Sequence, residues 1–227
     1  MRRIFFVTAL LILFTHVCYA STLDKSVADS QARQSFTLRS VEGKIFDVRI
    51  VGDGETVLTD WLWGNDDTIY AADYSAYLGD ANSDTLTRQD VELFANNYGG
   101  EHPQRINVTR PNRDGFYKIM GVNGLPDLLV SQIQVTGGGY FDMKIFVVKS
   151  GRLQLVRFLD DDKKTLRESF NTYSKPATYL DDGTLSIPWH TNAMPAAGSY
   201  ETVYMFDADN LILIPAYTKK TWSPRQN

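Results

Sequence analysis

The chain has 227 residues, of which 43% are hydrophobic, and its 27 acidic and 23 basic side chains give a net charge of −4. This length and apolar content suffice for a folded domain with its own core. The acidic balance, with no basic cluster in the sequence, argues against nucleic acid or an anionic membrane surface as a partner.

The first 20 residues have the pattern of a secretory signal peptide. Met1-Arg2-Arg3 is basic, Ile4 to Phe14 is almost wholly apolar, and Cys18-Tyr19-Ala20 places small residues three and one before a cleavage site. Removing these 20 of 227 residues leaves 207, takes away the only cysteine and two arginines, and changes the net charge from −4 to −6. No later stretch approaches the ~20 apolar residues that cross a bilayer. We therefore expect a periplasmic or secreted protein with no membrane span.

The N-terminal part of the remaining chain divides into two regions of different composition. Residues 21–34 are small, polar and charged, and we expect them to form a flexible tether. From Ser35 onwards apolar and polar residues alternate, which is typical of strands, and residues 35–222 are predicted to form a single β-rich domain. Trp61 and Trp63 share one face of an early strand. Such a pair either stacks on a sugar or packs against the core.

A loop further along the chain has the side chains that a hard cation prefers. Asp80, Asn82 and Asp84 fall at alternate positions, and Asp90 follows six residues after Asp84. A tight loop can turn alternate side chains inward, and a carboxylate on a following helix can complete the shell of oxygen ligands. These four residues are therefore a candidate site for a structural Ca²⁺ ion.

A short helix is predicted directly after this loop, over residues 88–98. Thr87 is a good N-cap, apolar residues recur at helical spacing, and Gly99 is placed for the C-cap. Loop and helix, residues 80–98, resemble one calcium-binding repeat of dockerin-type modules, which is of the EF-hand type. The resemblance implies that the four candidate residues bind calcium, although the usual sixth-position glycine and a second repeat are missing. The alternative is an Asp/Asn-rich turn that caps the helix.

A second resemblance covers residues 120–130. The run Gly121-Val122-Asn123-Gly124-Leu125-Pro126-Asp127-Leu128 is similar to an eroded repeat of the FG-GAP or VCBS type. In that family the repeats form propeller blades and their loop carboxylates hold calcium. Only Asn123 and Asp127 remain here, too few for a tight site. We expect a metal-free loop between two strands, with Asp127 tying the turn.

The rest of the sequence consists of short predicted strands at an even spacing. Turns such as Ser150-Gly151 and Asp209-Asn210 separate them. The predicted fold class is therefore mainly β, with short antiparallel strands and one prominent short helix. The resemblance at 120–130 favours a propeller-like or meandering arrangement, and a β-sandwich is the alternative.

The residues left after signal-peptide removal contain none of the common catalytic motifs. They hold two histidines and no cysteine, with no Gly-x-Ser-x-Gly and no His-Glu-x-x-His. We therefore expect an exported binding protein, not an enzyme, whose partner is a protein or a small molecule outside the cytoplasm. Candidate residues for binding that partner are Trp61, Trp63, Trp189 and His190.

Two other functions stay open at this point. One is a periplasmic resistance, immunity or inhibitor-type protein that neutralises an antibiotic or a hydrolase by binding, with the loop near 190–200 as the inserting segment. The other is a carbohydrate-binding or glycoside-hydrolysing protein. The latter predicts that Trp61, Trp63 or Trp189 is exposed and responds to sugars.

Overall fold

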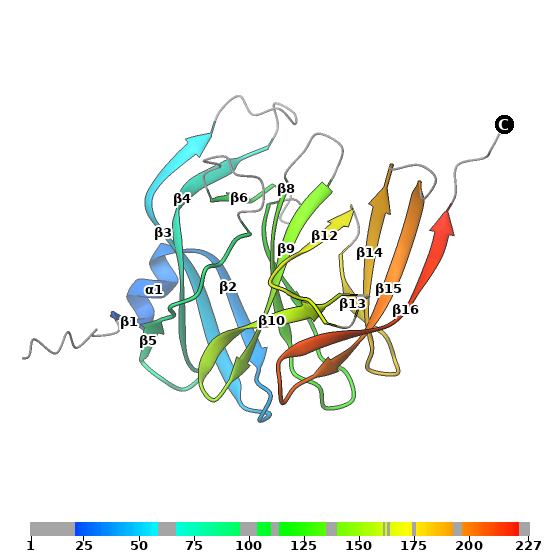
Figure 1. Ribbon diagram of the computed structural model, residues 1–227. Helices are drawn as coiled ribbons and strands as arrows, with labels where there is room; N and C mark the ends of the chain where they lie inside the picture. Colours follow the sequence, from blue (N-terminus) through cyan, green and yellow to red (C-terminus); the bar gives the residue numbers. More distant parts are fainter. Residues whose placement is uncertain are drawn as a thin grey trace, which may run out of the picture.

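Figure 1 shows a computed structural model of the chain. Its described residues are mainly β, as the sequence predicts, with one short helix. The predicted signal peptide lies outside the residues that the structure describes. Those residues are 21–58, 67–95, 104–109, 114–134, 140–160, 162, 164–173, 176–192 and 197–222.

The N-terminal half forms an antiparallel sheet with the order β1-β5-β4-β3-β2, and β6 pairs with β4. The helix α1 connects β1 to β2 and lies against β3 (Figure 1). The elements are β1 (Thr22–Asp24), α1 (Lys25–Gln31), β2 (Ala32–Arg39), β3 (Ile45–Leu58), β4 (Ile69–Asp80), β5 (Thr85–Arg88) and β6 (Arg105–Asn107).

The C-terminal half forms a larger sheet with the order β13-β14-β15-β16-β10-β9-β8-β7, and β11 and β12 pair with β10 and β9. Its pairs are antiparallel except β10 with β16, which run parallel. The elements are β7 (Gly115–Ile119), β8 (Leu128–Gln134), β9 (Tyr140–Lys149), β10 (Arg152–Leu159), β11 (Leu166–Arg167), β12 (Phe170–Tyr173), β13 (Thr178–Tyr179), β14 (Leu185–Thr191), β15 (Gly198–Asp207) and β16 (Ile212–Trp222).

This larger sheet curls into a nearly closed barrel. Strand β12 pairs with β9 and also lies beside β14, at the far end of the strand order. The Thr172 hydroxyl donates to the carbonyl of Pro188 at 2.6 Å and so joins β12 to β14. A proline suits this position, because the bond to the neighbouring strand uses its carbonyl and not the missing N–H.

Strands β8 and β9 form the wall between two cores. Every residue of β9 from Phe141 to Val148 is buried, as expected for a strand covered on both faces. Phe146 and Val148 face the core shared with the first sheet, whereas Met143 and Ile145 face the core inside the barrel. The side-chain period of two divides the strand between the two cores.

Residues 21–34 form β1, α1 and the beginning of β2 where the sequence predicts a flexible tether. Ala28 of α1 is fully buried. The polar residues of this segment pair with the sheet: Lys25 with Asp47 and Asp29 with Arg49. The polar composition therefore reflects an ion-paired element and not an unfolded one.

The prediction of a helix over 88–98 is wrong for the residues that the structure describes. Arg88 ends β5, and residues 89–95 have no helical turn. The Gln89 N–H donates to the Ala76 carbonyl at 2.8 Å and so extends the pairing with β4. Leu93 and Phe94 are nevertheless buried, because an extended segment also buries its apolar side chains against a core. The fold's short helix is α1.

Candidate functional site

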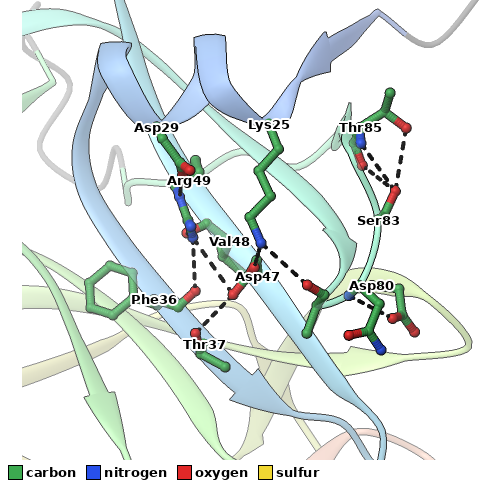
Figure 2. Close-up of polar contacts among 12 residues, drawn as sticks. Lys25, Asp29, Phe36, Thr37, Asp47, Val48, Arg49, Asp80, Ser83 and Thr85 are labelled. Carbon is green, nitrogen blue, oxygen red and sulfur yellow. Dashed lines mark hydrogen bonds and ion pairs between the residues drawn. The ribbon is translucent and has the colours of Figure 1, made fainter.

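The predicted calcium loop forms the tight turn between β4 and β5. The Asp80 carboxylate accepts the Asn82 N–H at 3.1 Å, and the Asp80 carbonyl accepts the Ser83 N–H at 2.8 Å. The Ser83 hydroxyl donates to the Thr85 carbonyl at 2.8 Å (Figure 2). The bond from the Asn82 N–H to the Asp80 carboxylate is that of an Asx-type turn, in which an aspartate side chain accepts a main-chain N–H two residues ahead.

A lysine ammonium lies at this turn. Lys25 donates to the Ala81 carbonyl at 3.3 Å and forms an ion pair with Asp47 of β3 (Figure 2). Asp47 also accepts the Thr37 hydroxyl at 2.8 Å and lies 3.9 Å from Arg49. Burial alone would raise the pKa of Asp47, but the hydrogen bonds from Lys25 and Thr37 outweigh it and lower the pKa below its usual value.

The turn does not gather all four predicted ligands. Strand β5 runs back along β4, and Gln89 pairs beside Ala76, four residues from Asp80. At ~3.3 Å per residue this places Asp90 about 13 Å or more from Asp80, whereas calcium ligands lie at ~2.5 Å from one ion. Within the described ranges, no group of three or more His, Cys, Asp or Glu is arranged to hold a metal. Calcium binding by Asp80, Asn82 and Asp84 stays a prediction.

The loop from Gly121 to Asp127 connects β7 to β8, and the predicted contact of Asp127 with its turn is confirmed. The Asp127 carboxylate accepts the Gly121 N–H at 2.8 Å and the Arg39 N–H at 3.1 Å. The Arg39 guanidinium donates to the carbonyls of Gly121 and Leu125 at 2.9 and 2.6 Å. A side-chain cation from β2 therefore binds the carbonyls of this loop.

Two hollows among the described residues bear on the predicted sites. The first is a groove of about 1170 Å³ between β10 and the segment from β5 to Val91. Predicted ligands Asp80 and Asp90 both line it, at different positions along the wall. The turn after β15, from Asp209 to Leu211, also contributes to the lining.

The second hollow is a pocket of about 780 Å³ at one end of the barrel, and Trp189 lines it. Trp189 of β14 lies on the same face of the strand as Leu185 and Ile187, which are in the barrel core. Its indole stacks on Tyr200 of β15, with ring centroids 4.4 Å apart and an angle of 13° between the planes. The register pairs these two residues directly across the strands, where side chains are closest.

Polar contacts hold this aromatic pair in place. The Trp189 Nε1–H donates to the Thr202 hydroxyl at 3.0 Å, and Thr202 is bonded to Thr218 of β16 at 2.8 Å. The Lys220 ammonium lies 5.5 Å from the centre of the Tyr200 ring, within cation–π range. Further pocket residues with hydrogen-bonding side chains are Asp160, Arg167, Glu168, Ser169 and Asn171.

His190 lies on the opposite face of β14 from Trp189. Its Nδ1 is 3.1 Å from the Ser199 hydroxyl and its Nε2 is 2.8 Å from the side-chain oxygen of Asn192. The side-chain amide of Asn192 donates to the Tyr140 hydroxyl at 3.0 Å. Trp189 and His190 are therefore neighbours in sequence but do not share a site, since successive side chains of a strand point to opposite faces.

Three of the sequence predictions fall partly or wholly outside the described residues. These are Trp61, Trp63 and residues 193–196 of the loop near 190–200. Sequence reasoning in turn missed Tyr200 and Lys220. Tyr200, Tyr204 and Phe206 fall at even spacing in β15, which could have marked Tyr200, but its pairing with Trp189 depends on the register between the strands.

No protein-family model matches the chain, and comparisons with curated proteins and with solved structures find no match either. Among the described residues, no helix has both the length and the apolar character to cross a membrane.

Proposed function

We propose that this chain is a non-catalytic binding protein, exported as its N-terminal segment predicts, that holds a saccharide in the pocket at the end of the barrel. The observation that carries the proposal is the Trp189 indole in the wall of that pocket, held flat by its stack on Tyr200. A sugar ring has one relatively apolar face that packs on a flat aromatic ring, and hydroxyls at its rim that need hydrogen-bonding partners.

The support for a saccharide comes from rigidity as well as composition. The Trp189 indole is fixed by its bond to Thr202 and by the Tyr200 ring, so little side-chain entropy would be lost on binding. The remaining lining offers an amide from Asn171 and a carboxylate from Glu168, both exposed. The pocket volume lies in the range of about 300–1000 Å³ that is usual for small-molecule sites.

The test is a titration of the purified protein with glucose, N-acetylglucosamine and their linear oligomers, followed by tryptophan fluorescence and calorimetry. We expect saturable binding of at least one saccharide, lost in Trp189→Ala. Trp222→Ala is the matched control, because Trp222 is 54% exposed and does not line the pocket. Binding that survives Trp189→Ala, or no binding by any saccharide, would contradict the proposal.

The non-catalytic part of the proposal has its own measurement. Each saccharide that binds is incubated with the protein, and the products are separated by chromatography. We expect the saccharide to be recovered unchanged. Release of shorter sugars, abolished in Trp189→Ala, would replace a binding protein with a glycoside hydrolase at the same pocket.

A further inference from the structure

One edge of β10 carries main-chain groups without partners in the described part of the chain. Strands β9 and β10 are joined by the two-residue turn Ser150-Gly151, whose φ angles of 52° and 69° are those of a type I′ hairpin. Lys149 and Arg152 therefore form the hydrogen-bonded pair that closes the hairpin. Bonded and non-bonded pairs alternate from there, so Leu153 and Leu155 direct their N–H and C=O groups away from β9.

The two ends of this outer edge are occupied. The Leu153 N–H donates to the Gln89 side-chain carbonyl at 3.0 Å, and the Arg157 N–H donates to the Leu211 carbonyl at 3.0 Å. Between them, no described residue bonds to the Leu153 carbonyl or to the N–H and carbonyl of Leu155. Both leucines line the groove of about 1170 Å³. Leu155 is half-buried and Leu153 is 2% exposed, so the main-chain groups of Leu155 are the central contact that the edge offers.

We propose that this edge binds an extended peptide segment of a partner protein by strand addition. A residue in the extended conformation can give its N–H to the Leu155 carbonyl and accept the Leu155 N–H, and a residue two positions away can donate to Leu153. An extended backbone presents donors and acceptors at this spacing. The groove shares only Glu168 with the lining of the Trp189 pocket, and the proposal does not depend on the saccharide proposal.

Two neighbouring contacts support this occupant. From Arg157 onwards the same edge already accepts a strand, because β16 pairs there in parallel. At the other end, the Gln89 amide imitates a peptide group at the Leu153 N–H. The edge is therefore geometrically able to accept a backbone, and among the described residues the outward main-chain groups between the two contacts have no bonded partner.

The surroundings of the edge favour a single chain over a second copy of this protein. Strand β10 lies between the first sheet and the beginning of β16 (Figure 1). The groove walls on the two sides come from the segment ending at Val91 and from the turn at Asp209. A single extended chain needs less room between such walls than the edge of a folded sheet. Apolar lining from Phe46 and Leu78 favours apolar residues at alternate positions of the peptide.

The experiment uses a fluorescein-labelled heptapeptide of alternating threonine and valine, capped at both ends, and measures fluorescence anisotropy with the purified protein. Two further peptides carry N-methyl groups on the threonines or on the valines only. Because alternate N–H groups of a strand point to the same side, we expect one methylated peptide to lose binding by about tenfold or more and the other to bind like the parent. Equal effects of the two methylations, or no saturable binding of the parent, would overturn the proposal.

A pair of protein variants tests the same contact from the other side. Leu155→Pro removes the outward N–H, which β9 does not use, and proline is tolerated at such edge positions. Leu155→Ala removes the same side-chain packing but keeps the N–H, so it is the matched control. We expect about tenfold weaker binding in Leu155→Pro and a change below threefold in Leu155→Ala. Equal binding by both variants would overturn the proposal.

Two further measurements serve as controls for the binding experiments. Thermal melts establish that both variants fold, and if Leu155→Pro does not, the methylated peptides decide the question on the unaltered protein. Sedimentation of the free protein tests the second copy as occupant. A dimer that the heptapeptide dissociates would overturn the proposal in favour of self-association at β10.

Discussion

Lys25 at the start of α1 and Asp47 near the beginning of β3 form an ion pair that joins residues 22 positions apart. The Asp47 side chain is 9% exposed and that of Lys25 27%. The pair therefore anchors the N-terminal helix to the first sheet, and it also brings the ammonium to the turn between β4 and β5 (Figure 2).

Replacing Lys25 with methionine is expected to lower the free energy of unfolding by about 1–3 kcal/mol, because the nearly buried Asp47 carboxylate loses its main partner. Urea unfolding followed by circular dichroism measures the change. Asp29→Ala is the control, since Asp29 pairs with Arg49 at the surface and should cost less than about 1 kcal/mol. Equal losses in the two variants would show that the pair with Asp47 contributes nothing beyond a surface contact.

Stability is expected to fall in acid. The pKa values of Asp47 and Glu55 lie below their ordinary values of 3.8 and 4.5; for Glu55 the main cause is the hydrogen bond from Arg33. The unfolded chain therefore takes up protons first, so both contributions are complete above the ordinary pKa values and disappear as the pH falls through the lowered ones. Unfolding free energies measured from pH 7 to pH 2 test this. Glu55→Gln should flatten the curve below about pH 4.5, and an unchanged slope would contradict the assignment.

Gly121→Ala is expected to destabilise the loop between β7 and β8 by about 2–3 kcal/mol. A β-carbon on Gly121 would lie 2.0 Å from the Leu125 carbonyl oxygen and 2.5 Å from that of Pro126, and main-chain atoms held by Arg39 cannot move aside cheaply. Gly124→Ala is the control: its β-carbon meets nothing within 4 Å, so only its φ of +84° costs about 1 kcal/mol. Thermal and urea unfolding compare the two, and a smaller loss for Gly121→Ala would be the contrary result.

Asp90→Ala is expected to leave any response to calcium unchanged, because β5 carries Asp90 away from the turn that holds Asp80. The measurement is calorimetric titration with calcium, together with melting in calcium and in chelator. Asp80→Ala and Asp84→Ala are the comparison variants, in which a calcium response of the unaltered protein should be lost. A response abolished by Asp90→Ala would mean that the segment after β5 folds back onto the turn when calcium binds.

Local features of the sequence were enough to predict the mainly β class and several turns. The alternation of polar and apolar residues marks strands such as β2 and β3, because it follows from the period of two in any half-buried strand. Ser150-Gly151 predicts a hairpin, and Asp127 predicts a tied turn, because both depend on residues close in the chain. Each of these three features is present in the structure.

The candidate sites depended on contacts between distant residues. A helix over 88–98 is a sound local expectation, but the Gln89 N–H bonds to Ala76 on a neighbouring strand instead. The stack of Trp189 on Tyr200 and the open edge at Leu155 require the register of particular strand pairs. Main-chain hydrogen bonds form equally well in several registers, so the register is decided largely by which faces the two cores bury. Sequence alone determined the strand character and several turns. Tertiary packing decided where the helix forms and which strands meet.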